Sequence, residues 1–536
     1  MTNGVPYETA WQNYQTGSSD PVQFDDSSKE SLLKQFHPDY QTNTTTTLQI
    51  GANQGDVCQR QLAQVLQSNS LIDEVDLAGA SIVDTDVLII GGGGAGCAAA
   101  LVATENDARV ILTTKLRLGD CNTVMAEGGL QASVGVDDTP QQHFEDTLRA
   151  GYFKADRKLV SQMVMDGPDV VRWLIQLGMQ FDQESEDPFA SLSLKRAGGT
   201  SAPRILSFRD YTGLEMMRVL REAVTYRPGI EVWRSKPVVE LLSNEFGHCA
   251  GAAVYDMRHR KLMLVRAHAV ILATGGIGRM HLNAFPTSNH FGATGDGLVL
   301  AYRLGAKLRE LDSFQYHPTG VSYPRHLAGS LVSEAARSAG ATLLNGLGER
   351  FVDELQPRDV VAASIIRECE EGRGIDWDGQ VGVWLDTPRL EQQRPGILQR
   401  FGSLRHLAHK CGHDPAEKPF LVYPTLHYQN GGVVIQRNGS TSVPGLFCAG
   451  EVTGGIHGRN RLMGNALLEI MSFGWRAGVA AAGLRHNAPH RRLTIEHVHK
   501  WQRELTLAGL PLDNHGPQLY PDYANFNLRA HIAGEI

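Results

Sequence analysis

The chain has 536 residues, a formal net charge of −8, and 42% apolar and 20% charged residues. This length allows two or more domains around a large core, and the composition is typical of a soluble globular protein. The acidic balance argues against a nucleic-acid partner, because phosphate binding needs a basic face. The longest apolar runs fall far short of the roughly 18 residues needed to cross a bilayer, so we expect no direct membrane span. The first residues show no basic start, apolar stretch or twin arginine. We therefore expect a cytoplasmic protein that would reach a membrane only through partner subunits.

Seven cysteines are scattered along the chain, and none belongs to a Cys-x-x-Cys pair. Local spacing therefore assembles neither an iron–sulfur cluster nor a zinc site, and we predict no metal ligands. Any relay of electrons must then belong to another chain.

Residues 1–83 form a polar N-terminal arm that includes the tract Thr44 to Thr47. Such a tract cannot bury enough surface to fold alone. Within the arm, helices are predicted over Ser31 to Phe36 and Val57 to Leu66. We interpret the arm as wrapped on its own domain, with a partner-docking segment as the alternative.

A dinucleotide site is predicted where the apolar run Val87 to Ile90 breaks into four glycines and a small-residue helix, Cys97 to Val102. A second strand, Ala108 to Thr114, completes a βαβ unit around the spacing Gly91-x-Gly93-x-x-Gly96. Glycines let the backbone approach a pyrophosphate, and the helix N-terminus supplies free N–H groups. The second strand ends Thr113-Thr114-Lys115, without the acid expected for the ribose, so the ribose must be held in another way.

Strands and helices alternate over residues 84–312, as in a layered α/β domain. Val270 to Gly276 is predicted as a buried strand ending in a glycine pair, and a helix is predicted from Leu298 to Leu304. Residues 313–426 are richer in charge and turns. The α/β pattern returns over 427–484 with a strand at Gly445 to Glu451 and a helix from Asn465 to Ala482, before a tail at 485–536. This order predicts a cofactor domain interrupted by an inserted domain.

Several motifs between residues 84 and 484 resemble, in order, those of the flavoprotein subunits of the succinate dehydrogenase and fumarate reductase family, which includes L-aspartate oxidase. They are Gly91 to Gly96, Ala126 to Gly129, Ala293 to Gly297, Tyr316 to Gly320, Ser333 to Arg337, Gly348 to Phe351, Pro357 to Val361, His427 to Gly432 and Asn460 to Glu469. The resemblance implies an α/β fold in which a Rossmann-like FAD-binding domain is interrupted by an inserted α+β capping domain.

The resemblance also implies that the dinucleotide is FAD. Respiratory members bind it covalently through a histidine in a Ser-His-Thr stretch, whereas this chain has Cys121-Asn122-Thr123. Asparagine cannot form that link, so we expect noncovalent FAD. The residues expected to bind it are Gly91, Gly93, Gly94, Ala95, Gly96, Thr114, Lys115, Asn122, Thr123, Ala126, Gly128, Gly129, Ala273, Thr274, Gly275, Asp296, Glu451, Asn465 and Leu467.

The family's substrates are small dicarboxylates, which need cations and hydrogen-bond donors at both ends. The positions that match the family's carboxylate ligands are His317, Thr319, Ser333, His427 and Arg461. Arg358 matches the arginine that donates a proton to the alkene, and Glu334 and Arg337 match its proton relay. Without the family context, the i, i+3 spacing of Glu334 and Arg337 would indicate a surface ion pair worth under about 1 kcal/mol.

The chain departs from the family pattern at Thr200, where histidine is common, and at Ser338-Ala339, which replace Gly-Glu. Its C-terminal region is also shorter than that of the respiratory subunits. We expect a subunit that interconverts fumarate and succinate, with reduction favoured, and that receives electrons from a separate iron–sulfur subunit. The alternatives are an L-aspartate oxidase and a flavin electron-transfer subunit with an altered substrate.

Overall fold

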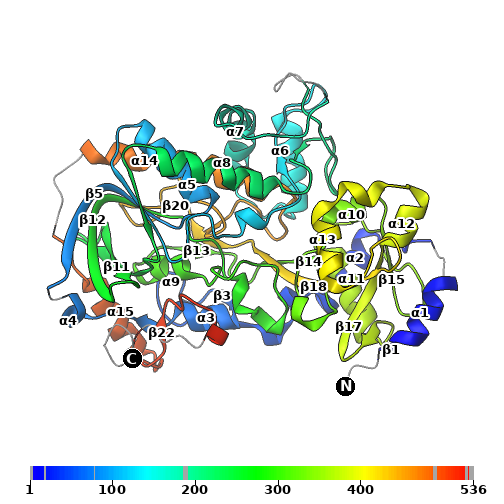
Figure 1. The fold of residues 1–536 in the computed structure, drawn as a ribbon. Coiled ribbons are helices and arrows are strands. Elements are labelled where there is room, and N and C mark those ends of the chain that lie inside the picture. Colours follow the sequence, from blue (N-terminus) through cyan, green and yellow to red (C-terminus); the bar gives the residue numbers. More distant parts are fainter. Residues whose placement is uncertain are drawn as a thin grey trace.

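Two bodies lie side by side in the computed structural model, each built on its own sheet (Figure 1). The structure describes residues 4–16, 20–77, 79–184, 191–486, 492–524 and 529. We call the body around the seven-stranded sheet the dinucleotide body, and the body around the six-stranded sheet the capping body.

The dinucleotide body has the strand order β10-β11-β12-β5-β6-β9, and β20 also pairs with β12. Its central strands are parallel, and the apolar run Val87 to Ile90 lies buried between neighbours on both sides. The strands are β5 (Ser81–Ile90), β6 (Val110–Thr114), β9 (Ile230–Arg234), β10 (Val238–Ser243), β11 (Cys249–Asp256), β12 (Lys261–Leu272) and β20 (Leu446–Cys448).

Two helices far apart in the sequence, α5 (Gly94–Glu105) and α14 (Asn465–Gly483), pack closely together on this sheet (Figure 1). Small residues make the approach possible: a Cβ at Gly474 would lie 2.7 Å from the Ala95 carbonyl oxygen, and one at Gly478 would lie 2.6 Å from that of Ala99. Further helices of this body are α6 (Pro140–Ala150), α7 (Arg157–Gln176), α8 (Thr212–Tyr226), α9 (Asp296–Arg303) and α15 (Glu496–Leu507).

The capping body has the strand order β1-β16-β17-β18-β14, with β15 paired to β17. All of its pairs are antiparallel except that of β1 with β16. Strand β18 continues past residue 426, the boundary expected from the sequence. The elements are β1 (Val5–Pro6), β14 (Phe314–Val321), β15 (Thr342–Leu344), β16 (Ile375–Trp377), β17 (Gln380–Asp386), β18 (Phe420–Gln429), α10 (Glu334–Ser338), α11 (Arg358–Glu370), α12 (Thr387–Gln393) and α13 (Gly402–Cys411).

The described part of the N-terminal arm packs against both bodies. Helix α1 (Tyr7–Thr16) lies on the capping body, where Tyr14 Oη donates to Asp386 Oδ1 at 2.7 Å. Helix α2 (Asp26–Phe36) packs through Leu32 and Leu33 on α11. The arm then crosses to the dinucleotide body, where α3 (Arg60–Leu66) contacts α9.

The predicted helix from Val57 to Leu66 is wrong in its first turn. Val57–Gln59 forms strand β3, which pairs with β2 (Thr45–Thr47), so the threonine tract gains backbone partners that it lacks alone. The helix begins only at Arg60, where the Gln59 side chain accepts from the Leu62 N–H. Helix α2 starts earlier than predicted because Asp25 caps it by accepting from the Ser28 N–H.

Short elements complete the fold. Strand β22 (His515–Gly516) in the C-terminal tail pairs with β4 (Asn69–Ser70) of the arm. Within the described ranges, no helix combines the length and apolar character required to cross a membrane. Besides short 3-10 helices, the remaining elements are α4 (Glu74–Leu77), β7 (Leu130–Gln131), β8 (Ile205–Leu206), β13 (Leu308–Arg309), β19 (Gly432–Val434) and β21 (Thr453–Gly454).

Candidate active site

A cavity of about 840 Å³ is lined by residues of both bodies. Of the residues expected to hold the cofactor, all but Gly96 and Asn465 line it. Of the expected substrate and catalytic residues, all but Thr319 and Arg337 line it. Residues from distant parts of the sequence are thus brought together around one space.

Two glycines of the turn after β5, Gly91 and Gly96, leave no room for side chains. A Cβ at Gly91, whose φ is +116°, would lie 2.2 Å from the Ala273 carbonyl oxygen. A Cβ at Gly96 would lie 1.9 Å from the Gly91 carbonyl oxygen, so Gly96 serves the packing of helix on strand and not the cavity wall. The turn leads into α5, which begins at Gly94, and the N-terminal end of the helix dipole favours a pyrophosphate there. The Gly94 N–H itself donates to Thr123 Oγ1 at 3.3 Å.

A carboxylate from another element lies next to the end of β6, where the sequence carries no acid. Asp296, the first residue of α9, accepts from Lys115 Nζ at 2.7 Å through Oδ2. Thr274, another lining residue, has a buried Oγ1 without a hydrogen-bond partner among the described residues. With the glycine turn, these groups fit a dinucleotide such as FAD.

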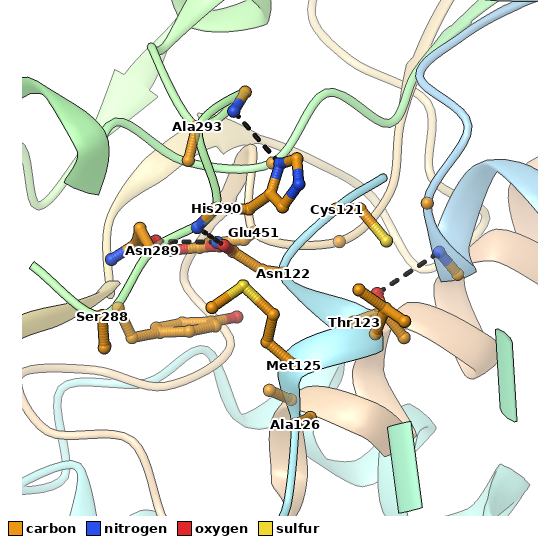
Figure 2. A pocket seen from close by; sticks show the side chains of 18 of the residues that line it. Cys121, Asn122, Thr123, Met125, Ala126, Ser288, Asn289, His290, Ala293 and Glu451 are labelled. Carbon is orange, nitrogen blue, oxygen red and sulfur yellow. Dashed lines mark hydrogen bonds between the residues drawn. The ribbon is translucent and has the colours of Figure 1, made fainter. Parts of the chain in front are cut away.

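Asn122 lies on the cavity wall in a network of amide and carboxyl groups (Figure 2). Its Nδ2 donates to Asn289 Oδ1 at 2.7 Å and to Glu451 Oε2 at 3.1 Å, and its Oδ1 accepts from the His290 N–H at 2.7 Å. The neighbouring Cys121 is a poor nucleophile, since burial raises the pKa of its thiol. Glu451 was expected from the sequence, but residues 288–290 carry no motif, so no signal in the sequence pointed to Asn289 or His290.

Two guanidinium groups meet at the capping end of the cavity. Arg358, the first residue of α11, donates from Nη1 to Gln315 Oε1 at 3.0 Å, and Arg461 donates from Nη2 to the same oxygen at 3.0 Å. Gln315 was not predicted from the sequence. Its position on β14, two residues before His317, was the available signal, because residues two apart on a strand face the same side.

The two candidate imidazoles lie beside these guanidiniums. His317 on β14 and His427 on β18 have ring centroids 5.2 Å apart. Burial and the charge of Arg358 hold the pKa of each histidine well below its usual range, so both rings are neutral donors or acceptors. Thr319 does not reach the cavity, but its Oγ1 contacts His317 Nδ1 at 3.4 Å and so supports the ring.

Glu334 stands behind Arg358 and connects it to Arg337. Glu334 Oε2 accepts from Arg358 Nε at 2.7 Å and lies 3.4 Å from Arg337 Nη2. Although burial opposes it, the two arginines hold the pKa of Glu334 below its ordinary value. All three side chains are largely buried, which rules out a surface ion pair at this position.

Glu127, in the Ala126 to Gly129 motif, is a second cavity residue that was not singled out from the sequence. Its Oε2 is buried without a hydrogen-bond partner within the described structure. Burial and the neighbouring Asp210 raise the pKa of Glu127 to about 8.

Thr200, one of the departures from the family pattern, does not line the cavity. Its hydroxyl donates to the Ala197 carbonyl oxygen at 2.8 Å.

Asn465 is likewise turned to the protein and not to the cavity. Its Oδ1 lies 2.8 Å from His143 Nε2, and its Nδ2 donates to Thr147 Oγ1 at 2.9 Å, which fixes the start of α14 against α6.

Residues 86–467 match the family model described as an FAD-binding domain. The chain is 39% identical over 428 residues to a subunit of the fumarate reductase (CoM/CoB) of Methanothermobacter marburgensis, covering 77% of this chain and 76% of that protein. It is also 39% identical over 415 residues to the L-aspartate oxidase of Streptomyces coelicolor, covering 75% of this chain and 69% of that protein. Among solved structures, E. coli quinol fumarate reductase matches with a TM-score of 0.71 and 30% identity, over 80% of this chain and 74% of that one.

These matches confirm the resemblance drawn from the motifs, the FAD cofactor and the interrupted α/β fold. The chain is an FAD-dependent oxidoreductase that belongs to the flavoprotein family of the fumarate reductases and succinate dehydrogenases, in which L-aspartate oxidases are equally close relatives.

Proposed function

We propose that this chain interconverts fumarate and succinate, with reduction favoured, using noncovalently bound FAD. The observation that carries the proposal is the meeting of Arg358 and Arg461 on Gln315, beside two neutral imidazoles. Arg358 and Arg337 both lie beside the carboxylate of Glu334, and Arg461 adds a third guanidinium next to Arg358. Closely placed guanidiniums of this kind suit the carboxylates of a dicarboxylate substrate.

In this proposal, Arg461 and His427 hold one carboxylate of the substrate, and His317 and Ser333 hold the other end. FAD, when bound, supplies the hydride that adds to one alkene carbon. The protein's contribution is to grip the carboxylates more tightly as negative charge develops, which lowers the barrier more than it stabilises the bound substrate.

Arg358 donates the proton to the second alkene carbon. A free guanidinium has a pKa above about 12 and does not give up a proton readily. The transfer becomes feasible if it coincides with carbanion formation and if the proton is replaced at once. The 2.7 Å contact from Arg358 Nε to Glu334, with Arg337 behind it, supplies such a route.

We infer that a separate iron–sulfur subunit exchanges electrons with this chain. The seven cysteines include no Cys-x-x-Cys pair that could hold a cluster. Asn122 stands where the respiratory members carry the histidine of the covalent link, which in the family is associated with succinate oxidation, and this favours the reductive direction.

L-aspartate oxidase is the second candidate, because the relative from Streptomyces coelicolor is as similar as the fumarate reductase relative. Aspartate also carries two carboxylates, and the same cations would bind them.

The test compares two assays on purified protein. Consumption of reduced viologen on adding fumarate supports fumarate reduction, whereas peroxide release on adding L-aspartate in air supports the oxidase. Arg358→Gln should abolish fumarate turnover while the protein stays yellow. Arg503→Gln, an exposed change on α15, is the matched control and should keep full activity. Turnover that survives Arg358→Gln would refute the assigned proton donor.

A further inference from the structure

The described tail residues 515–524 cross one end of the cavity, and Leu519 belongs to its lining. This end is where β6 stops at Thr114 and Lys115. In a βαβ unit the pyrophosphate lies at the glycine turn and the adenosine ribose lies at the end of the second strand. At Leu519 the tail therefore covers the adenosine end of the cofactor site.

Lys115 ties this tail to the cofactor site. Its buried Nζ donates to Thr294 Oγ1 at 2.6 Å, to Asp296 Oδ2 at 2.7 Å and to the Leu519 carbonyl oxygen at 2.6 Å. A lysine ammonium has three N–H donors, so none is left for a ligand. Lys115 thus acts as a brace that fixes the Asp296 carboxylate against the tail.

Leu519 contributes its side chain as well as its carbonyl group. The side chain is only 4% exposed and packs in a cluster that includes Val239, Leu242 and Leu264 of the sheet. Leu519, a lining residue of the cavity, is therefore anchored in an apolar cluster on the sheet of the dinucleotide body.

Both ends of the segment are fixed. Upstream, β22 pairs with β4, and Arg303 Nη2 donates to the Gly516 carbonyl oxygen at 2.9 Å. Downstream, Arg279 donates to Tyr523 Oη and, at 3.0 Å, to the Asn289 carbonyl oxygen. The segment is held on both sides of Leu519 by charged hydrogen bonds.

We propose that residues 515–524 are part of the FAD site and close it over the adenosine half of the cofactor. This role rests on the noncovalent FAD of the proposed function: where Asn122 provides no covalent link, the retention of FAD depends on contacts of this kind.

The test measures binding of FAD, ADP and FMN to the apoprotein of Leu519→Ala by flavin fluorescence and calorimetry. Trimming the wall should weaken FAD and ADP by about tenfold, because roughly that factor follows from losing part of one buried leucine contact. FMN lacks the adenosine half and should bind as it does to the unchanged protein. Leu512→Ala, an exposed leucine of the same tail, is the matched control and should leave all three affinities unchanged.

If Leu519→Ala does not fold, Tyr523→Phe provides a milder change, since Tyr523 is 53% exposed. Removing the hydroxyl that Arg279 holds should speed FAD release at least about twofold. Equal weakening of FMN and FAD, or a Leu519→Ala protein that binds FAD as tightly as Leu512→Ala, would overturn the proposal. These binding assays contain no dicarboxylate, so their outcome is independent of whether fumarate proves to be the substrate.

Discussion

Gln315 is the point at which the two guanidiniums of the cavity are held together. One amide oxygen accepts from both Arg358 and Arg461, and the Gln315 Nε2 donates to Asn460 Oδ1 at 2.9 Å and to the Arg461 carbonyl oxygen at 2.7 Å. Both positive groups are largely buried and repel each other in a medium of low polarity, and the shared acceptor offsets part of this repulsion.

Gln315→Ala should therefore lower kcat/KM for fumarate by about 10- to 100-fold, the range expected for one lost hydrogen bond to charged groups. Steady-state kinetics with reduced viologen measures it. Gln315→Glu is the informative comparison: it keeps an acceptor for both arginines but adds a negative charge, so KM for the dianion should rise. Unchanged kinetics in Gln315→Ala would contradict the role assigned to this residue.

Glu127 should make the stability of the protein depend on pH. Burial and Asp210 raise its pKa in the folded state to about 8, whereas an unfolded glutamate has a pKa near its ordinary value. At pH values between these two pKa values, Glu127 keeps its proton in the folded state and has lost it in the unfolded state. The contribution of neutral Glu127 to the free energy of unfolding is therefore fully present below the pKa of the unfolded state. It falls as the pH rises towards about 8 and then stays level.

Glu127→Gln removes this titration and should flatten the decline in melting temperature between about pH 5 and pH 8. Thermal unfolding across this range, with Glu145→Gln on the exposed side of α6 as control, provides the measurement. A decline of the same slope in Glu127→Gln and in the unchanged protein would show that another group is responsible.

At the scale of elements, the sequence predicted the strands and helices whose formation depends on their own residues. The apolar run Val87 to Ile90 and the small-residue helix after it could be read directly, because their burial follows from composition alone. Val57–Gln59 could not, since three residues that continue into a helix carry no period of their own. They are a strand only because Thr45–Thr47 lies opposite, a partner set by tertiary contact.

The residues of the site likewise fall into those that the sequence could predict and those that it could not. Arg358, His317, His427 and Arg461 lie in motifs, and their convergence could be expected from the resemblance. Asn289 and Leu519 lie in loops without a motif, and only the path of the chain brings them to the cavity.

Helix α2 of the N-terminal arm supports the helix that begins with Arg358. Leu33 is 5% exposed and packs with Leu32 against Val360 and Ala363 of α11. Leu33→Ala should lower the free energy of unfolding by about 2–4 kcal/mol, because it removes buried methyl groups and leaves a cavity. Chemical denaturation measures the change. Lys34→Ala on the exposed face of α2 should cost under about 0.5 kcal/mol, since it removes only a surface pair with Glu30. Equal effects of the two changes would mean that the arm does not brace α11.

At the scale of the whole molecule, the cofactor site is a space shared by segments from nearly the entire chain. The glycine turn and Asn122 come from its first part, His317 and Arg358 from the capping body, and Glu451 from the returning α/β segment. A ligand that fills this cavity touches all of them at once, so its binding energy stabilises the two bodies as one unit.

This arrangement predicts how the protein responds to removal of FAD. Because the proposed FAD is noncovalent, acid should release all of the flavin and leave a colourless polypeptide. The melting temperature of the apoprotein should then rise with the logarithm of the concentration of added FAD. At an FAD concentration 100 times the dissociation constant, the free energy of unfolding should increase by about 2.7 kcal/mol. Differential scanning fluorimetry follows this titration, and added riboflavin should give a smaller shift because it lacks the pyrophosphate that the glycine turn binds. Flavin fluorescence that stays with the denatured polypeptide on a gel would show a covalent bond and refute the prediction.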